Sequence, residues 1–448
     1  MDYTPPQASR WGGATRREFL ALASLSAVGA LSGCAANPVT GENQLMLMSE
    51  ADEIGVDKQQ SPHQFSSDYG TSQDRILNTY LHQIGTRMGS LSHRPKMPYS
   101  FRCVNAVYIN AYAFPGGSIA VTRGILLKLN NEAELAALLG HEIGHVNARH
   151  AASQMSKGIM AQLALAGAAA AVGVAAGGAA GEVAASLGML GAGALLASYS
   201  RDNEREADAL GMEYTVRSGY SPDGMVGLMA MLNSLHKGQP SSAEMLFSTH
   251  PMSDERYASM QQAARTHYAG ARGYPVQRER YMDAIAGLRA RRGTIEALQQ
   301  GEEALGKKKY PEAEAQFRSA LQQTPDDYTG LVLMAKCMLV QKRAADAQAF
   351  TDRARQIYPT EAQARHLGGM VRLRRKEYDG AYSEFAESDR LLPGNPTTVF
   401  LKGFSLEGGN HKREAAQEYQ RYLQQVQEGK EAQYAQKRLV EWGYIKKQ

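Results

Sequence analysis

Apolar residues recur at helical spacing along much of this chain. Over residues 74–89 they fall three or four positions apart, which predicts an amphipathic helix with one buried face. The apolar positions of this helix are Ile76, Leu77, Tyr80, Leu81 and Ile84. Helices are also predicted from Ser49 onward and over residues 131–150, where Asn130 or Asn131 serves as the N-terminal cap.

Two segments have the composition of β-strands instead. Residues 99–112 are rich in β-branched and aromatic residues, which predicts a strand. A second short strand is predicted over residues 119–122, because Pro115, Gly116 and Gly117 form a turn just before it.

Residues 158–198 are dominated by alanine and glycine and carry one charge, Glu182. The segment is long enough to cross a bilayer, but it is poor in large apolar residues and would insert weakly. We expect a helical hairpin that packs over the active site or against a membrane. A transmembrane hairpin and a flexible lid are the alternatives.

The chain from about residue 294 to residue 427 repeats itself every 34 positions. The phased positions are Pro325, Pro359 and Pro393, then Ala313, Ala347, Ala381 and Ala415, and finally Phe317, Phe385 and Tyr419. A 34-residue period with a small residue, an aromatic residue and a closing proline is the tetratricopeptide pattern. Thr351 replaces the aromatic residue in the second unit. We expect four repeats and a final helix, which bind proteins or serve as a spacer.

Residues 1–34 have the pattern of an export signal. Arg16 and Arg17 precede a short apolar run over residues 21–31, and small residues lead to Cys34. The paired arginines indicate a twin-arginine signal, with a general secretory signal as the alternative. The Leu-Ser-Gly-Cys ending resembles a bacterial lipobox, which implies that Cys34 carries the lipid anchor. The same resemblance implies sorting to the outer membrane, because Ala35 follows the cysteine.

Composition excludes several classes of protein. The formal net charge is only +4 and no long basic run occurs, which argues against a nucleic-acid partner. Hydrophobic residues make up 43% of the chain, enough for folded cores but not for a polytopic membrane protein. Beyond Cys34 there are only Cys103 and Cys337, so a disulfide scaffold is excluded.

An H-E-x-x-H motif carries the candidate chemistry. On a helix, His141 and His145 project from one face and can reach one metal ion, with Glu142 beside a water at that ion. Such a site needs a third ligand. Glu204 and Asp208 are four positions apart on a predicted charged helix, so Glu204 can complete a zinc site and Asp208 can orient a ligand imidazole.

These motifs resemble those of the gluzincin metallopeptidases related to HtpX and the CAAX prenyl proteases. The resemblance rests on His141–His145, Glu204–Asp208, Thr249–Pro251 with Arg256, and the segment Asn37–Gly41. The lipoprotein signal, single catalytic domain and repeat tail are most similar to periplasmic members of that family. The resemblance implies zinc ligation by His141, His145 and Glu204, one zinc ion per chain, and Glu142 as general base and later acid.

The resemblance also implies roles for two residues further along the chain. His250 would be a catalytic residue or a fourth metal ligand that gates activity, and Arg256 would lie near the reacting carbonyl. Without the resemblance, His250 reads as a turn histidine and Arg256 as a surface ion pair. His150, off the ligand face, and Tyr199 are expected to be structural.

The chemistry also predicts how a substrate is held. An exposed strand edge formed by Ile119, Ala120, Val121 and Thr122 would bind an extended peptide by main-chain pairing. Such binding recognises main-chain N–H and C=O groups, so it favours unfolded segments.

We therefore expect an α+β fold, with a mostly helical zincin-type domain and small sheet over residues 35–285 and an α-solenoid over residues 294–448. The predicted function is a membrane-anchored periplasmic zinc endopeptidase, placed at the outer membrane, that acts on unfolded or misassembled envelope proteins. The repeats would dock substrate or an outer-membrane assembly machine. The alternative is a chaperone or scaffold whose metal site is held shut.

Overall fold

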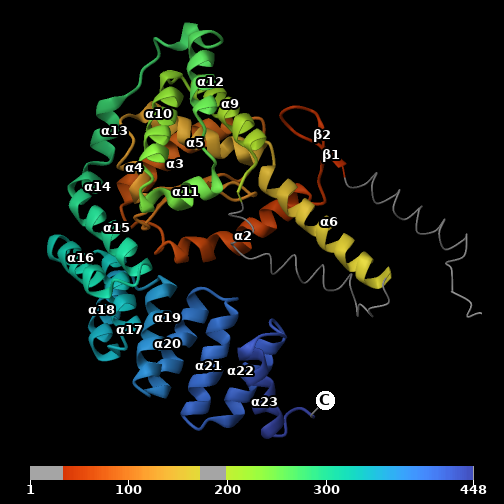
Figure 1. The fold of residues 1–448 in the computed structure, drawn as a ribbon, viewed down its shortest axis with the longest axis vertical. Coiled ribbons are helices and arrows are strands. Elements are labelled where there is room, and N and C mark those ends of the chain that lie inside the picture. The colour runs from red at the N-terminus through yellow and green to blue at the C-terminus, as the bar shows by residue number, and fades with distance from the viewer. Residues whose placement is uncertain (1–33, 172–197, 447–448) are drawn as a thin grey trace, which may run out of the picture.

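The computed structural model describes residues 34–171 and 198–446, which form a mostly helical molecule in two halves (Figure 1). The N-terminal half surrounds α5 and contains both small sheets. Its elements are β1 (Cys34–Ala36), β2 (Asn43–Leu45), α2 (Glu50–Ser67), α3 (Arg75–Ser90), β3 (Ser100–Val104), β4 (Ala111–Ala113), β5 (Ser118–Thr122), α4 (Arg123–Leu126), α5 (Glu132–Asn147), α6 (His150–Ala171), α9 (Arg201–Arg217), α10 (Asp223–Gly238), α11 (Glu244–Thr249), α12 (Asp254–Arg265), α13 (Arg278–Ala284) and α14 (Ala286–Ala290).

The three-stranded sheet corrects two sequence predictions. Its strand order is β3-β5-β4, with β5 parallel to β3 and antiparallel to β4. The prediction that Ile119, Ala120, Val121 and Thr122 offer a free edge is therefore wrong, because both sides of β5 are already paired. The strand predicted over residues 99–112 is divided into β3 and β4, since these two strands pair on opposite sides of β5 and the chain must cross between them.

The predicted amphipathic helix is α3, and Asp74 caps it by accepting from the backbone N–H of Leu77. Leu77, Leu81 and Ile84 are buried as predicted. Ile76 is 76% exposed, so it lies outside the buried face. The pattern located this helix correctly but included one position too many.

The C-terminal half is a row of helix pairs. Between residues 292 and 423 the four pairs are α15 (Arg292–Gly306) with α16 (Tyr310–Gln323), α17 (Tyr328–Val340) with α18 (Ala344–Ile357), α19 (Ala362–Arg374) with α20 (Tyr378–Leu391), and α21 (Pro396–Gly408) with α22 (Lys412–Leu423). The final helix is α23 (Lys430–Glu441). The four predicted repeats are thus present.

The phased aromatic residues explain how each helix pair closes. They meet glycines of the preceding helix, in the pairs Phe317 with Gly301, Phe385 with Gly369 and Tyr419 with Gly403. In the second unit Thr351 replaces the aromatic residue, and Ala335 stands in the glycine phase. In this unit Thr351 is smaller than the aromatic residue of the other units, and Ala335 is larger than their glycine. The two helices of the second unit still form a pair.

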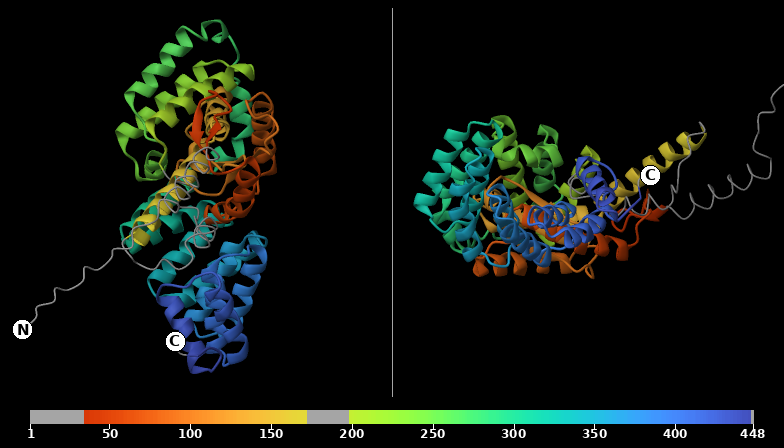
Figure 2. Two further views of the ribbon diagram at one scale, coloured as in Figure 1. Left: turned by 90° about the vertical axis from the view of Figure 1, so that its right-hand side faces the viewer. Right: turned by 90° about the horizontal axis from the view of Figure 1, so that it is seen from below.

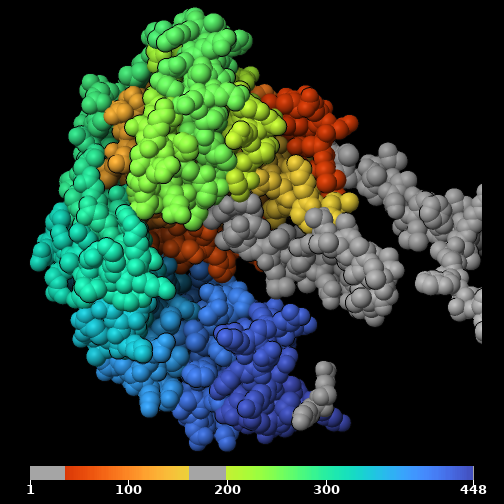
Figure 3. Space-filling view, viewed as in Figure 1, coloured from red at the N-terminus to blue at the C-terminus, as the bar shows by residue number. Residues whose placement is uncertain are grey.

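The repeats curve beneath the N-terminal half and join it directly (Figure 2). One hydrophobic core runs from Met46 to Val371, across the predicted boundary between residues 285 and 294. Polar contacts cross the same junction, from Gln299 to Val107, Arg123 to Asp327, Thr329 to Asn105 and Gln363 to Ser66. In the space-filling view α2 lies recessed between the upper helices and the repeats (Figure 3). The repeats contact the N-terminal half through α15, α17 and α19. Ile357 at the end of α18 also contacts it, by accepting a hydrogen bond from Gln73.

The alanine- and glycine-rich segment is described only in part. Its beginning belongs to α6, which ends at Ala171, and residues 172–197 lie outside the described residues. The predicted hairpin therefore stays a prediction. Among the helices that the structure describes, none combines the length and apolar character needed to cross a membrane.

Candidate metal centre

The two motif histidines lie one turn apart on α5, whose sixteen residues are all buried. Asn131 caps this helix by accepting from the backbone N–H of Glu134. Arg149, in the left-handed region at φ 60°, separates α5 from α6. His141 Nε2 and His145 Nε2 approach each other to 3.0 Å. Both rings therefore face one point, as the motif spacing predicts.

Close helix packing brings an acidic residue of α9 to the same point. A Cβ atom on Gly140 would lie 2.8 Å from the backbone oxygen of Gly211, and one on Gly211 would lie 2.9 Å from the backbone nitrogen of His141. Only glycine allows α5 and α9 to pack this closely at these positions. As a result, Glu204 Oε1 lies 3.4 Å from His145 Nε2, and Glu204 Oε2 lies 3.7 Å from His141 Nε2.

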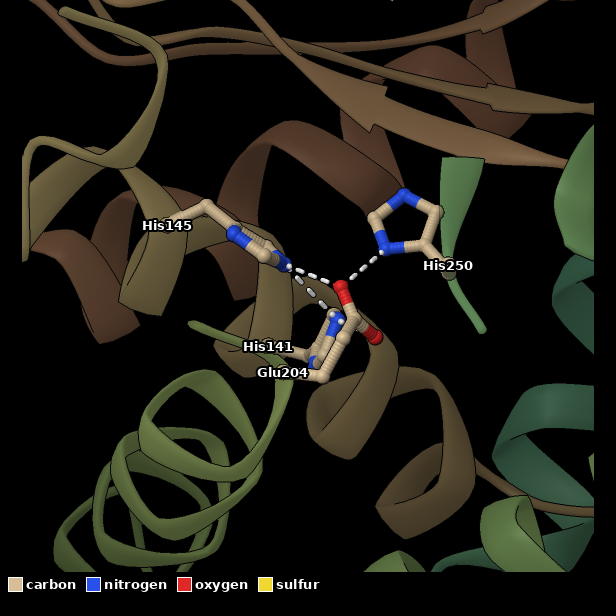
Figure 4. Close-up of side chains that lie close together, drawn as sticks. All are labelled: His141, His145, Glu204 and His250. Atoms are coloured by element: carbon tan, nitrogen blue, oxygen red, sulfur yellow. Dashed lines mark hydrogen bonds and ion pairs between the residues drawn. The ribbon is translucent and has the colours of Figure 1, made fainter. Parts of the chain in front are cut away.

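A third histidine joins this pair of helices from the end of α11. His250 Nδ1 lies 3.0 Å from Glu204 Oε1 (Figure 4). All four residues are buried, and each offers one ligand atom within 4.8 Å of the others. The structure thus brings together the three predicted ligands, His141, His145 and Glu204, and the predicted fourth, His250.

The cluster has the chemistry of a cation site. Glu142 Oε2 is buried and has no hydrogen-bond partner among the described residues. A carboxylate buried without a partner is costly, and a cation beside it would remove much of that cost. Two imidazole nitrogens and one carboxylate oxygen form a donor set that zinc takes while keeping a further position open. The residues present therefore fit a zinc ion.

Burial and neighbouring charges set the protonation of the cluster. Burial would raise the pKa of Glu204, but His250 and His145 outweigh it and hold that pKa well below its ordinary value. Burial keeps the pKa of His145 well below the usual range. Burial would lower the pKa of His250, but Glu204 raises it. An ionised Glu204 and a neutral His145 are the forms that bind a metal.

Glu142 lies next to the cluster without joining it. Burial raises its pKa, and His250 and His141 oppose this rise. Together with His250, Glu142 lines an apolar pocket whose other walls include Leu138, Leu228, Leu232, Leu246 and Phe247. A carboxylate at the edge of an apolar pocket suits proton transfer to and from a bound substrate.

Asp208 and Arg256 form a buried ion pair behind His141. Arg256 Nε and Nη2 each donate to the Asp208 carboxylate at 2.7 Å. Asp208 Oδ1 lies 3.0 Å from His141 Nδ1, although the ring is not aligned for a full hydrogen bond. Asp208 thus lies beside His141, one of the predicted ligands. Arg256 is buried and not on the surface, and it also lies 2.7 Å from Glu204 Oε2.

Two residues outside the predicted set also contact the cluster. His150 was expected to be structural, yet its Nδ1 lies 2.9 Å from His145 Nδ1. A continuous helix would turn His150 away, but the break at Arg149 turns it back, and no glycine or proline in the sequence marks that break. The ring of Tyr199 stacks on His145 with centroids 3.9 Å apart. Both residues therefore hold the His145 ring.

Known proteins match both halves of the chain. The model of Peptidase family M48 matches residues 75–264, and a tetratricopeptide repeat model matches residues 304–369. The chain is 31% identical over 201 residues to the beta-barrel assembly-enhancing protease of Yersinia pestis. It is 30% identical over 209 residues to the metalloprotease YcaL of Escherichia coli (strain K12), covering 47% of this chain and 78% of that protein.

These matches differ in how much of each relative they cover. The match to the Yersinia protein covers 43% of this chain and only 40% of that protein. Among solved structures, the tetratricopeptide protein YrrB is similar over 46% of this chain and 97% of its own, at 16% identity. Its TM-score of 0.31 is too low to support an argument.

Proposed function

The chain belongs to peptidase family M48, and we propose that it is a zinc-dependent endopeptidase that cleaves unfolded or misassembled envelope proteins. One observation carries the proposal. Beside the buried cluster of His141, His145 and Glu204 lies Glu142, whose Oε2 is buried and has no hydrogen-bond partner among the described residues. A protein that only binds partners has no need for such a carboxylate at a metal site.

In this proposal His141, His145 and Glu204 hold one zinc ion per chain. When bound, zinc supplies a Lewis acid that lowers the pKa of water and polarises the peptide carbonyl. Glu142 accepts the proton of the attacking water and returns it to the leaving amine nitrogen. Once His250 moves away from Glu204, it would donate to the carbonyl oxygen.

Arg256 takes a different role in this proposal from the one the resemblance implied. Its guanidinium is engaged by Asp208 and Glu204, so it holds these two acids in place. Asp208 in turn holds the His141 ring. Arg256 is therefore a positioning residue that acts through Asp208 and Glu204.

Because β5 is paired on both sides, the proposed substrate-binding edge must belong to another strand. In the sheet of the described residues β4 is an outer strand with β5 on one side. Ala113, Phe114 and Pro115, at its end, line a small pocket together with His145 and Tyr199. We infer that an extended substrate pairs with β4, which leads it toward the cluster.

The proposed location rests on the sequence alone. Leu-Ser-Gly before Cys34 supports a lipid anchor, and the paired arginines support export to the periplasm, with Ala35 favouring the outer membrane. The repeats would dock substrates or an outer-membrane assembly machine. The name of the Yersinia relative, which refers to β-barrel assembly, and the repeat match support this choice of partner.

A second candidate function is a chaperone or scaffold whose metal site is held shut. It is favoured by the contact of His250 Nδ1 with Glu204 Oε1 at 3.0 Å, which places a third imidazole where a substrate or water would bind. The two functions can exist in one protein if His250 moves.

The test of peptidase activity is the change Glu142→Gln. Zinc-loaded wild type and variant are given β-casein, an unfolded protein, and cleavage is followed with time. We expect a loss on the order of 10²–10⁴-fold, with zinc binding retained, because the proton acceptor is removed. Glu213→Gln, on the surface-facing side of α9, is the matched control and should cleave as wild type does. Equal cleavage by Glu142→Gln and wild type would refute Glu142 as the base.

The same assay with His250→Ala separates the two functions. Faster cleavage by the variant means that His250 restrains the enzyme, whereas slower cleavage means that it assists the reaction. If zinc-loaded wild type and His250→Ala both fail to cleave, the scaffold becomes the better proposal.

A further inference from the structure

The turn between β1 and β2 lies against α9, one of the helices that carry the candidate metal ligands. Asn37 closes this turn. Its Oδ1 accepts from the backbone N–H of Val39 at 2.8 Å, and its own backbone N–H donates to Glu42 O at 2.8 Å. The remaining group of its side chain, Nδ2, points out of the turn and donates to Glu206 Oε1 at 2.9 Å. Asn37 thus connects the N-terminal hairpin to α9.

The contact continues from Glu206 to a proposed zinc ligand. Glu206 Oε2 lies 3.1 Å from His150 Nε2, and His150 Nδ1 lies 2.9 Å from His145 Nδ1. Asn37, His150 and His145 are buried, while Glu206 is partly exposed. These contacts form a relay from Asn37 through Glu206 and His150 to His145.

Metal binding fixes the direction of every hydrogen bond in this relay. His145 Nε2 faces the cluster, so it must be unprotonated to bind a metal, and the ring proton then sits on Nδ1. Nδ1–H donates to His150 Nδ1, which leaves the proton of His150 on Nε2. That N–H donates to Glu206, whose second oxygen accepts from Asn37. Each group in the relay is therefore fixed as a donor or an acceptor at each of its hydrogen bonds.

We propose that Asn37 and Glu206 are positioning residues for the metal ligand His145, acting through His150. The inference rests on the proposed function, because it requires that His145 bind a metal. A metal-bound histidine generally donates its second N–H to a carboxylate or carbonyl, which fixes the ring and strengthens the ligand. His141 has Asp208 at that position, whereas His145 reaches its carboxylate through the inserted ring of His150.

The relay makes the N-terminal hairpin part of the metal site. The hairpin begins at Cys34, the proposed point of lipid attachment, three positions before Asn37. Retention of the metal therefore depends on this segment being docked against α9 and α6.

The test compares zinc affinity in the purified full-length protein, measured by competition with a coloured chelator. The variants are Asn37→Asp and Glu206→Gln. Asn37→Asp keeps the oxygen that accepts from Val39 but removes the donor to Glu206, so the turn is preserved. The matched controls are Asn43→Ala, at an exposed position of the same hairpin, and Glu213→Gln on the same helix as Glu206.

We expect both variants to bind zinc about 10–100-fold more weakly than the controls. The unfolding midpoints of the metal-free variants should match those of the metal-free controls. The visible absorption of the cobalt-loaded variants should differ from that of the cobalt-loaded controls, because the His145 ring is held less firmly.

Unchanged zinc affinity in Asn37→Asp and Glu206→Gln would overturn the relay while leaving the proposed function intact. A weaker affinity that only accompanies an equal loss of metal-free stability would also overturn it, since the residues would then be structural. If the wild type itself takes up no zinc, the proposed function and the relay both fail.

Discussion

Two buried Arg–Asp pairs in this molecule have similar geometry and different surroundings. At the junction of the halves, Arg123 Nη1 donates to Asp327 Oδ2 at 2.6 Å. The Asp327 carboxylate also accepts from the backbone N–H of Gly330, and Arg123 Nε donates to Asn105 O. Both side chains have their partners within the pair and the backbone around it.

The pair at the candidate metal centre is arranged otherwise. Arg256 is bidentate on Asp208 and also lies 2.7 Å from Glu204 Oε2. The pair faces His141, whose Nδ1 lacks a hydrogen bond among the residues described. A satisfied buried ion pair holds two parts of a fold together, whereas one next to unsatisfied groups holds those groups ready for a ligand. We therefore expect the Arg123–Asp327 pair to control stability and the Arg256–Asp208 pair to control metal binding.

The largest expected effect is on stability, from Asp327→Asn. The change leaves the Arg123 charge buried without its counter-charge, which costs about 3–5 kcal/mol of unfolding free energy. Urea unfolding of the metal-free protein measures it. Asp326→Asn is the matched control, because Asp326 is exposed and its pair with Arg353 contributes about 1 kcal/mol or less.

Asp327→Asn should leave the candidate metal centre unchanged. Zinc affinity of the folded variant should equal that of wild type. A variant as stable as Asp326→Asn, or one that loses zinc, would contradict the assignment of this pair to the junction.

The second effect, on metal binding, is expected from Arg256→Lys. Lysine keeps the positive charge but cannot bridge Asp208 through two nitrogens while it faces Glu204. Zinc affinity should fall about 10–100-fold, as for other residues that support metal ligands. Chelator competition measures this, with Arg205→Lys on the exposed side of α9 as control. A variant with full zinc affinity but strongly reduced stability would place Arg256 with Arg123, as a structural residue.

The smallest effect is the dependence of the junction on pH. Burial would raise the pKa of Asp327, but the ion pair and hydrogen bond with Arg123 outweigh burial and lower it. A lowered carboxyl pKa contributes stability that is complete above the ordinary value of about 3.9 and is lost as pH falls below it. Between pH 7 and about 5 this contribution should be constant.

Unfolding free energies measured down to pH 3 test the sign. Wild type should lose stability more steeply than Asp327→Asn below about pH 4, because only wild type has this carboxylate to protonate. Parallel curves for the two proteins would show that the pair contributes no acid sensitivity.

The features predicted correctly from the sequence are those fixed by a period. The 34-residue repeat and the four-residue spacings of His141 with His145 and of Glu204 with Asp208 place side chains on one face whatever else the fold does. The convergence of His250 and Arg256 on the cluster could be predicted only from the resemblance, since no spacing connects them to α5. Their roles in catalysis and metal binding stay predictions, as do the domain boundaries.

The errors arose where long-range packing decides the outcome. Whether residues 119–122 form a central or an edge strand depends on which side of β5 each neighbour pairs, and alternation of residues does not contain that information. The contact of His150 with His145 does not follow from their spacing, because one left-handed residue, Arg149, redirects His150. Arg149 is neither glycine nor proline, so local sequence gave no warning.

The most direct test of the account is the zinc dependence of peptide cleavage. Wild type is freed of metal with a chelator, then titrated with zinc while its cleavage of β-casein is measured, with Glu204→Gln alongside. If His141, His145 and Glu204 hold the catalytic zinc, cleavage is absent without metal and returns fully at one zinc ion per chain. Glu204→Gln then shows no cleavage at that ratio. Cleavage by the metal-free protein, or equal recovery by Glu204→Gln, would contradict the assignment of His141, His145 and Glu204 as the catalytic metal site.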